Sequence, residues 1–376
     1  MATRRDALKT LGAGAVALAA GRFTSAEAAG WAPYPRTVAI DGAGGSSLFW
    51  ISDDDAATRK ELDALRASGL SGIVLTLAPS GRFWMDDAAF EKTKATIDAW
   101  DAIIARHPKH LLAVRVAGDL QRARREGKLG LIYGFQGAEP LGEDLDRISL
   151  FRARGLRVIQ LTHNRRNLIG DGCMEPGNAG LSNFGHQVVE RLNAEKIVVD
   201  LAHGSARTMR EGIAASRASV LISHTGCRAL ANLPRNTDDA TLRALANKGG
   251  VAGIIFWPYL RTDTQPMAVD VIRHIEHAVK VCGEDHVGIG TDSGIAPVDR
   301  TPEFELENRE WVASAVEEGV FERGRPPDLY TFIPDLNRAD RFEVLAAMLS
   351  RRRHSDARIA KILGGNFARV MASVWR

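Results

Sequence analysis

The stretch Ile197-Val-Val-Asp-Leu-Ala-His203 (IVVDLAH) places an apolar run directly before an aspartate and a histidine. A short apolar run bounded by polar residues is typical of a strand buried on both faces of a parallel sheet. Runs of this kind recur along the chain and alternate with amphipathic helical segments. This alternation favours a parallel α/β fold.

Eight of these runs are predicted to be strands. They fit a (β/α)8 TIM barrel, which typically takes ~250 residues plus insertions, and a doubly wound sheet is the alternative. The predicted strands are residues 38–40, 72–77, 131–135, 158–161, 197–200, 220–223, 251–256 and 287–290. The predicted helices between them include residues 57–67, 90–105, 184–192, 208–215, 241–247 and 269–281.

Residues 296–335 break the alternation, because they include prolines, aromatic and acidic residues but little strand signal. They are predicted to form a lid-like insertion. Two closing helices are predicted after it, at 338–350 and 355–375, and the apolar spacing of the second should dock it on the barrel. No repeat or linker divides residues 30–376, so a single barrel domain is expected.

The first 29 residues contain Arg4-Arg5 and Lys9, then an apolar run over residues 11–20, then small residues around Ala26 and Ala28. This order is typical of a twin-arginine signal peptide, and an uncleaved amphipathic start is the alternative. The apolar run is far shorter than the ~20 residues that a membrane-spanning helix needs. Release into the periplasm or the medium is therefore expected, without a stable membrane anchor.

The charge of the chain is nearly balanced, with 49 Lys and Arg against 46 Asp and Glu, which does not indicate a nucleic-acid partner. Cys173, Cys227 and Cys282 are widely spaced and form no zinc-ribbon or CxxC pattern. They are expected to be structural or free thiols, although an oxidising compartment would permit one disulfide.

Polar residues follow several predicted strands, at the ends where barrel enzymes carry their chemistry. Imidazole and carboxylate are ligands of hydrolytic zinc, which polarises a carbonyl and lowers the pKa of bound water to roughly 7. One histidine after a strand is more often structural, but three histidines and an aspartate in register predict a site at the barrel mouth. The residues at these strand ends are Asp41, Gln136, His163, Asp200, His203, His224 and Asp292.

Three other histidines are not expected to join this site. His274 and His277 lie three residues apart on an amphipathic helix without an HExxH arrangement, which predicts a solvated face. His286 begins a strand at the bottom of the barrel, where a role in stability is expected.

Several stretches together resemble the membrane (renal) dipeptidase family of zinc metallopeptidases, which are amidohydrolase-type barrels. The stretches are LRVIQLTHN, GLSNFGHQVVERLN, IVVDLAHGSARTMREGI, SVLISHTGCRALANLPRN, HVGIGTDSG and IAKILGGNFARV, in the family's order. The resemblance covers most of the chain from about residue 37 to the end. It implies two zinc ions bridged by a carboxylate and a water, and cleavage of dipeptides, including ones with a D-residue at the C-terminal side. Pairing into a homodimer, as in many relatives, stays open.

The resemblance also implies a role for each of five residues. His203 and His224 match the two histidines of the second metal. Asp292 matches the aspartate of the first metal that also handles the proton. His163 matches the histidine that steadies the developing oxyanion. Arg235, in LPRN, matches the arginine that grips the substrate carboxylate, which suits a planar bidentate donor.

The sequence departs from the family at the end of the first strand. Family members read Asp-Gly-His-x-Asp there, and the histidine and second aspartate bind the first zinc, whereas this chain reads DGAGG over residues 41–45. Family members also have Glu-Gly where this chain has Gln136 and Gly137, and a neutral glutamine oxygen is a weak ligand. The first metal site is therefore expected to be emptied and the second partly kept, with one zinc ion or none.

Two hypotheses of function follow. The first is an exported metallo-dipeptidase-like hydrolase that uses one metal or an altered ligand set, with Asp41 and Glu139 as weaker candidate ligands. The second is a catalytically inactive relative that binds small peptides in the periplasm through Arg235 and His163. A weaker third idea is phosphate binding by the glycine turn. The retained Asp292, His203 and His224 favour the hydrolase, because a pure binding protein needs none of them. The loss of three ligands at once favours the binding protein.

Overall fold

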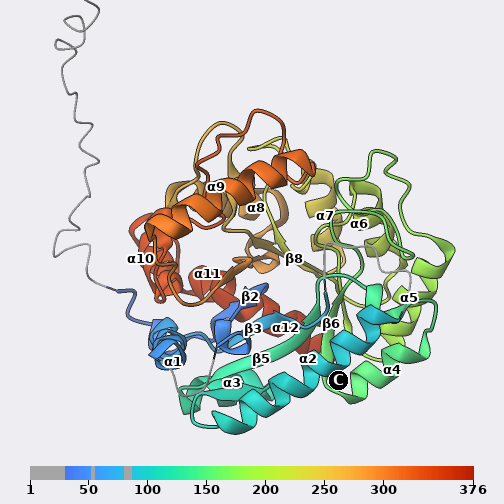
Figure 1. Cartoon of the computed structure of the whole chain (residues 1–376), viewed down its shortest axis with the longest axis horizontal. Helices are drawn as coiled ribbons and strands as arrows, with labels where there is room; N and C mark the ends of the chain where they lie inside the picture. Colours follow the sequence, from blue (N-terminus) through green and yellow to red (C-terminus); the bar gives the residue numbers. More distant parts are fainter. Residues whose placement is uncertain (1–29, 52–55, 80–86) are drawn as a thin grey trace, which may run out of the picture.

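Eight parallel strands neighbour one another in a nearly closed barrel with helices around it (Figure 1). The computed structural model describes residues 30–51, 56–79 and 87–376. The strand order is β1-β3-β5-β6-β7-β8-β9-β10. The predicted (β/α)8 barrel is therefore confirmed. Its strands are β1 (Ile40–Asp41), β3 (Gly72–Thr76), β5 (Leu129–Phe135), β6 (Leu156–Gln160), β7 (Val198–Asp200), β8 (Leu221–Thr225), β9 (Val251–Ile254) and β10 (Val287–Ile289).

The first and last strands meet at their carboxyl ends. The backbone N–H of Gly42 donates to the carbonyl of Ile289 at 2.8 Å. Just beyond, β2 (Gly44–Gly45) and β11 (Ser293–Gly294) form a short parallel pair. The turn after the first barrel strand thus lies beside the turn after the last one.

Helices surround the barrel and follow most strands, as the alternating pattern predicted. The six helices that were predicted between strands agree with α1, α2 and α5 to α8 to within two residues at each end. The helices are α1 (Ala56–Ser68), α2 (Ala88–Arg106), α3 (Gly118–Glu126), α4 (Asp146–Ala153), α5 (Asn183–Ala194), α6 (Ala206–Ala215), α7 (Asp239–Asn247), α8 (Ala268–Cys282), α9 (Pro302–Glu317), α10 (Arg341–Arg351), α11 (Asp356–Ala360) and α12 (Asn366–Val374).

The sequence patterns did not predict strand β4 (Leu111–Ala113) or helices α3, α4 and α9. β4 has three residues and pairs only with β5. α3 buries only Leu120 and Ala123, so its apolar stripe is too short to show a helical period. α9 lies within the lid-like insertion and begins at Pro302 after the N-cap residue Thr301.

The second closing helix is interrupted, so the prediction of one helix over 355–375 was wrong. α11 ends at Ala360, a π-helical segment follows, and α12 begins at Asn366. Gly364 interrupts the helical geometry where the chain passes close to the first strand. A Cβ atom on Gly364 would lie 2.5 Å from the carbonyl oxygen of Val38. The apolar spacing continues across this break, which is why the pattern did not reveal it.

Helix α12 packs against the amino ends of the strands. Its Phe367, Val370 and Met371 are buried in one cluster with Val198 and Leu221, which begin β7 and β8. Side chains therefore fill the bottom of the barrel, and the second closing helix docks there as predicted.

The histidines of α8 are not on a solvated face. His274 is 1 % exposed, its Nδ1 accepts from the backbone N–H of Cys227, and its Nε2 lies 3.0 Å from the Leu260 carbonyl. His277 is half-buried and lies 2.8 Å from Asp239. The prediction was wrong because this side of α8 packs against α7 and its neighbouring loops.

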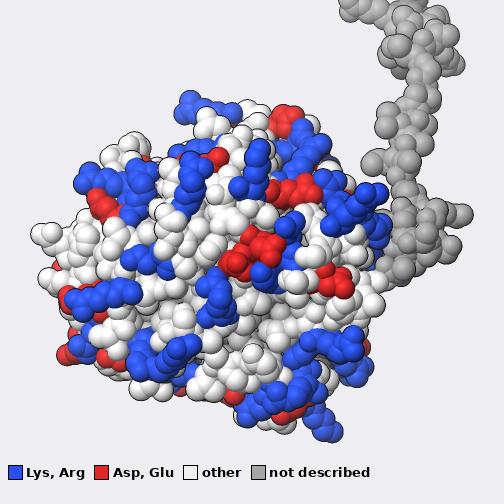
Figure 2. All heavy atoms as spheres, turned by 180° about the vertical axis from the view of Figure 1, so that it is seen from behind, with Lys and Arg blue, Asp and Glu red and all other residues white. Residues whose placement is uncertain are grey.

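The other features of the described residues agree with the sequence. All three cysteines are buried free thiols. His286 lies near the start of β10, where its Nδ1 contacts the Gly250 carbonyl at 2.8 Å. Lys and Arg side chains are interspersed with Asp and Glu on the face that Figure 2 shows. Within the described ranges, no helix is both long and apolar enough to cross a bilayer. The predicted signal peptide, residues 1–29, lies outside these ranges.

Candidate functional site

The carboxyl ends of three strands bring two histidines and an aspartate together. His224 lies in β8, His203 lies three residues after β7, and Asp292 lies three residues after β10. One potential ligand atom from each residue lies within 4.8 Å of the others. Both histidines are buried, and the Asp292 side chain is 21 % exposed. These three residues are called the His–His–Asp cluster below.

The two histidines of the cluster face each other through their Nε2 atoms, which are 2.9 Å apart. Asn164 fixes the ring of His203, because its Oδ1 accepts from Nδ1 at 2.7 Å and leaves the lone pair on Nε2. The Ser223 hydroxyl lies 2.8 Å from Nδ1 of His224 and can donate to it or accept from it. Both rings can therefore present an Nε2 lone pair to a cation, supported by outer contacts of the kind that metal-binding histidines make.

Burial keeps the histidines of the site neutral. It lowers the pKa of His203 and of His224 well below the ordinary value, and the positive charge of Arg235 lowers them further. The same two causes lower the pKa of His163 to about 4. Burial raises the pKa of Asp292, although Arg235 opposes this shift. The site thus combines neutral imidazoles, the form that binds metals, with a carboxylate of increased basicity.

His163 and Arg235 lie next to the cluster. The His163 ring stacks on the His203 ring with their centroids 4.2 Å apart. Arg235 is 2 % exposed, and its Nη1 donates to the His224 carbonyl at 3.1 Å. Within the described part of the chain, His163 Nδ1 and the Nε and Nη2 atoms of Arg235 are buried without a hydrogen-bond partner. Because buried polar atoms are normally paired, these atoms indicate a place for a polar ligand.

Two residues of the cluster have a left-handed backbone, with φ of 60° at His203 and 55° at Asp292. Such conformations cost about 1–3 kcal/mol and persist only where the surroundings enforce them. The N–H of Asp292 donates to the Ala43 carbonyl at 2.7 Å, and the Trp257 indole donates to the Asp292 carbonyl at 2.6 Å. These two hydrogen bonds fix the backbone of Asp292, whose side chain belongs to the same cluster as the two histidines.

The turn after β1 borders the same mouth without contributing to the cluster. The Oδ1 atom of Asp41 accepts from the N–H groups of Ala43 and Thr291, and its Oδ2 accepts from the Thr291 hydroxyl at 2.6 Å. Burial raises the pKa of Asp41 to about 7. Neither Asp41 nor Glu139 belongs to the cluster. The carboxyl of Asp41 instead ties the first strand end to the last.

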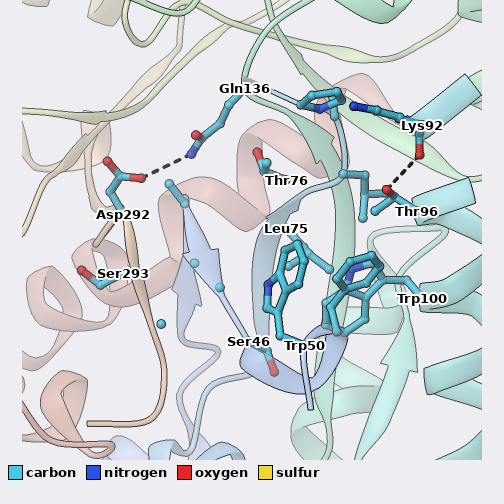
Figure 3. A pocket seen from close by; sticks show the side chains of 18 of the residues that line it. Ser46, Trp50, Leu75, Thr76, Lys92, Thr96, Trp100, Gln136, Asp292 and Ser293 are labelled. Carbon is cyan, nitrogen blue, oxygen red and sulfur yellow. Dashed lines mark hydrogen bonds between the residues drawn. The ribbon is translucent and has the colours of Figure 1, made fainter. Parts of the chain in front are cut away.

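A cavity of about 710 Å³ opens beside Asp292 (Figure 3). Ala43, Gly45, Gln136 and Asp292 all line it, so the three positions at which the resemblance implied further metal ligands border one space. The Gln136 amide nitrogen donates to Asp292 Oδ1 at 3.4 Å. The rest of the wall is mainly apolar and includes Phe49, Trp50, Leu75, Leu77 and Trp100.

The structure places all of the predicted site residues at one mouth, but sequence reasoning missed several that support them. Asn164 and Ser223 contact the ring nitrogens of His203 and His224. The sequence signal that could have found them is that each directly follows or precedes a predicted site histidine. No sequence pattern marked Trp50 or Trp100 as site residues, because Trp50 lies in a short turn after β2 and Trp100 lies on the outer helix α2. The residues brought together are Gln136, His163, His203, His224, Arg235 and Asp292.

Comparison with known sequences relates this chain to dipeptidases. A family model described as membrane dipeptidase (peptidase family M19) matches residues 49–317. Dipeptidase verJ of Clonostachys rogersoniana is 29 % identical over 293 residues, which are 77 % of this chain and 67 % of that protein.

Solved structures share the fold. An amidohydrolase from Pseudomonas aeruginosa superposes with a TM-score of 0.76 at 27 % identity, covering 91 % of this chain and 98 % of its own. A metallo peptidase from Rhodobacter sphaeroides, solved with a phosphinate mimic of the dipeptide L-Ala-D-Ala, superposes with a TM-score of 0.72 at 19 % identity. That match covers 90 % of this chain and 100 % of the other.

Proposed function

Because this chain belongs to the membrane dipeptidase family and is thus a hydrolase of the dipeptidase type, we propose that it cleaves a dipeptide or similar small amide with one zinc ion. The observation that carries the proposal is the His–His–Asp cluster. The dipeptide mimic bound to the Rhodobacter sphaeroides peptidase supports a dipeptide-like substrate.

The donor set of the cluster fits zinc. Two neutral imidazole nitrogens from His203 and His224 and a carboxylate from Asp292 are three ligands, the number that catalytic zinc takes while keeping a position open. Zinc held there would supply a Lewis acid for the amide carbonyl. We propose that the family's first metal site is absent, because Ala43 and Gly45 offer no ligand and Gln136 turns its amide nitrogen toward Asp292.

Separate side chains in and around the cluster are proposed to transfer the proton, stabilise the developing charge and bind the substrate carboxylate. Asp292 is the proposed general base, which takes a proton from the attacking water and passes it to the leaving amine. Its raised pKa suits this role. His163 steadies the negative charge that develops on the amide oxygen. Arg235 holds the substrate carboxylate through the guanidinium nitrogens that have no partner within the described residues.

Export by the twin-arginine route is part of the proposal. The order of paired arginines, apolar run and small residues in residues 1–29 supports it. Residues 30–376 would then act as one barrel domain in the periplasm or the medium.

Replacing His224 with alanine is expected to abolish zinc binding, because the variant keeps only two of the three cluster ligands. Elemental analysis after dialysis against chelator-free buffer with modest zinc should give about one zinc per chain for the native protein and none for the variant. His277→Ala, which removes a histidine outside the cluster, is the matched control. Equal zinc contents would mean that the retained histidines are structural. No turnover of a broad L-L and L-D dipeptide panel by the zinc-loaded protein would favour the inactive binding protein.

Arg235→Lys is expected to raise KM by about tenfold or more with a smaller change in kcat, because lysine lacks the planar two-nitrogen fork. The measurement compares peptides with a free carboxylate against their C-terminal amides. The native protein should prefer the free acid, and the variant should lose this preference. Arg228→Lys, whose arginine donates to the carbonyls of Leu233 and Pro234, is the control within the same loop. An equal loss with amidated peptides would contradict carboxylate binding by Arg235.

A further inference from the structure

We infer that the cavity beside Asp292 receives a large apolar or aromatic acyl group of the substrate, and that this group needs no free amine. The preferred substrates would then be amides in which an amino acid is the leaving half and an arylacetyl or similar apolar group is the acyl half. This inference rests on the proposed function, because it uses the expected position of the scissile bond.

The cavity lies on the acyl side of that bond. Asp292 belongs to both the His–His–Asp cluster and the cavity wall, whereas His163, His203 and Arg235 do not line the cavity. A substrate that places its carboxylate at Arg235 and its amide at the cluster must continue past Asp292 with its acyl half. Among the described residues, Asp292 lines this cavity of about 710 Å³ and a smaller one of about 250 Å³. The larger cavity has a volume within the usual ~300–1,000 Å³ of small-ligand sites.

The wall of the cavity favours an apolar occupant. Figure 3 shows the rings of Trp50 and Trp100 together on one side of the space, away from Asp292 and Gln136. Phe49 meets Trp50 edge-on at 4.7 Å and stacks on Trp100 at 6.2 Å between centroids. Trp50 is 82 % exposed, so an apolar group seated against its indole would remove a large hydrophobic surface from water.

The small residues of the turn after β1 create this space. Gly45 lines the cavity, and a Cβ atom on it would have no neighbour closer than 3.8 Å. Ala43 contributes only a methyl group. The same short side chains that remove metal ligands therefore leave room for substrate, and this room is specific to the altered turn.

Among the described residues of the wall, only one could pair with an ammonium group. Asp292 is the single carboxylate among the described residues that line the cavity, and the proposed reaction already uses it as the base. A charged amine moved into this space would lose its hydration without gaining a second counter-charge from the described residues, which is costly. An acyl group without an amine avoids that penalty.

The test compares three substrates with the zinc-loaded native protein: phenylacetyl-L-alanine, acetyl-L-alanine and L-phenylalanyl-L-alanine. We expect kcat/KM for phenylacetyl-L-alanine to exceed that for acetyl-L-alanine by about tenfold or more, since burial of a phenyl ring is worth at least that factor. It should equal or exceed that for L-phenylalanyl-L-alanine. A preference for the acetyl substrate, or an absolute need for the amine, would overturn the inference.

Two variants connect this preference to the cavity. Gly45→Leu fills the space from a backbone position without positive φ, and Trp50→Ala removes an exposed ring that the core does not need. Each should lower the ratio of phenylacetyl to acetyl turnover by about fivefold or more. Leu306→Ala, an exposed apolar residue on α9 that does not line the cavity, should leave the ratio unchanged. An unchanged ratio in folded Gly45→Leu protein would place the acyl group elsewhere.

Binding measurements separate this inference from the proposed function. If the native protein cleaves none of the three substrates, the proposed hydrolysis fails, and calorimetric titration with phenylacetyl-L-alanine and acetyl-L-alanine then tests the cavity alone. Tighter binding of the phenylacetyl compound that is lost in Gly45→Leu supports the cavity as an apolar site. Equal binding of the two compounds, or a preference that Gly45→Leu retains, contradicts it.

Discussion

Asp292→Asn is expected to lower kcat/KM by about 10²–10⁴-fold, because it removes the only carboxylate of the His–His–Asp cluster and with it the proposed general base. Asparagine has nearly the same size and tolerates the left-handed backbone found at this position, where φ is 55°. The variant should therefore fold normally. Steady-state kinetics on a cleaved dipeptide, together with a thermal unfolding curve, measure both effects.

Asp285→Asn is the matched control for this prediction. Asp285 precedes the same strand β10 at its opposite end, and its side chain is 58 % exposed. Its replacement should leave kcat/KM within about twofold of the native value, as for most surface changes. If Asp292→Asn retains activity similar to this control while remaining folded, another group must move the proton.

Introducing the metal ligands that the family resemblance implies is expected to raise both the zinc content and the activity. The combined variant Ala43→His, Gly45→Asp and Gln136→Glu places an imidazole and two carboxylates around a cavity that already contains Asp292. The zinc content should rise from about one to about two per chain, because four protein ligands would then surround the first site. We expect kcat/KM on small dipeptides to rise by about tenfold or more, since a second ion adds charge stabilisation.

The control for this experiment carries Ala43→Gln and Gly45→Asn, which have similar bulk but no imidazole or carboxylate. It should keep one zinc per chain and show no gain in activity. A restored variant that also stays at one zinc, with a native-like unfolding curve, would mean that these positions do not correspond to the first metal site.

Most of the barrel could be predicted because its strands are buried on both faces and read as short apolar runs. The site histidines could be located for a related reason, since His203 and His224 follow or end such runs. The orientation of their rings could not, because Asn164 reaches His203 from 39 residues away. The cavity was equally hidden, because it joins Trp50, on a short turn, to Trp100, on an outer helix. The break at Gly364 was missed because only its contact with Val38 reveals it.

The joining of the first and last strand ends has a consequence for folding kinetics. Asp41 and Thr291 are 250 residues apart in the chain, and contacts across so long a loop are entropically slow to form. Asp292 reaches its position only when this contact closes, whereas His203, just after β7, and His224, in the adjacent strand β8, both lie in the middle of the chain. After dilution from denaturant, helical signal should recover first, and catalytic activity should return in a later, slower phase.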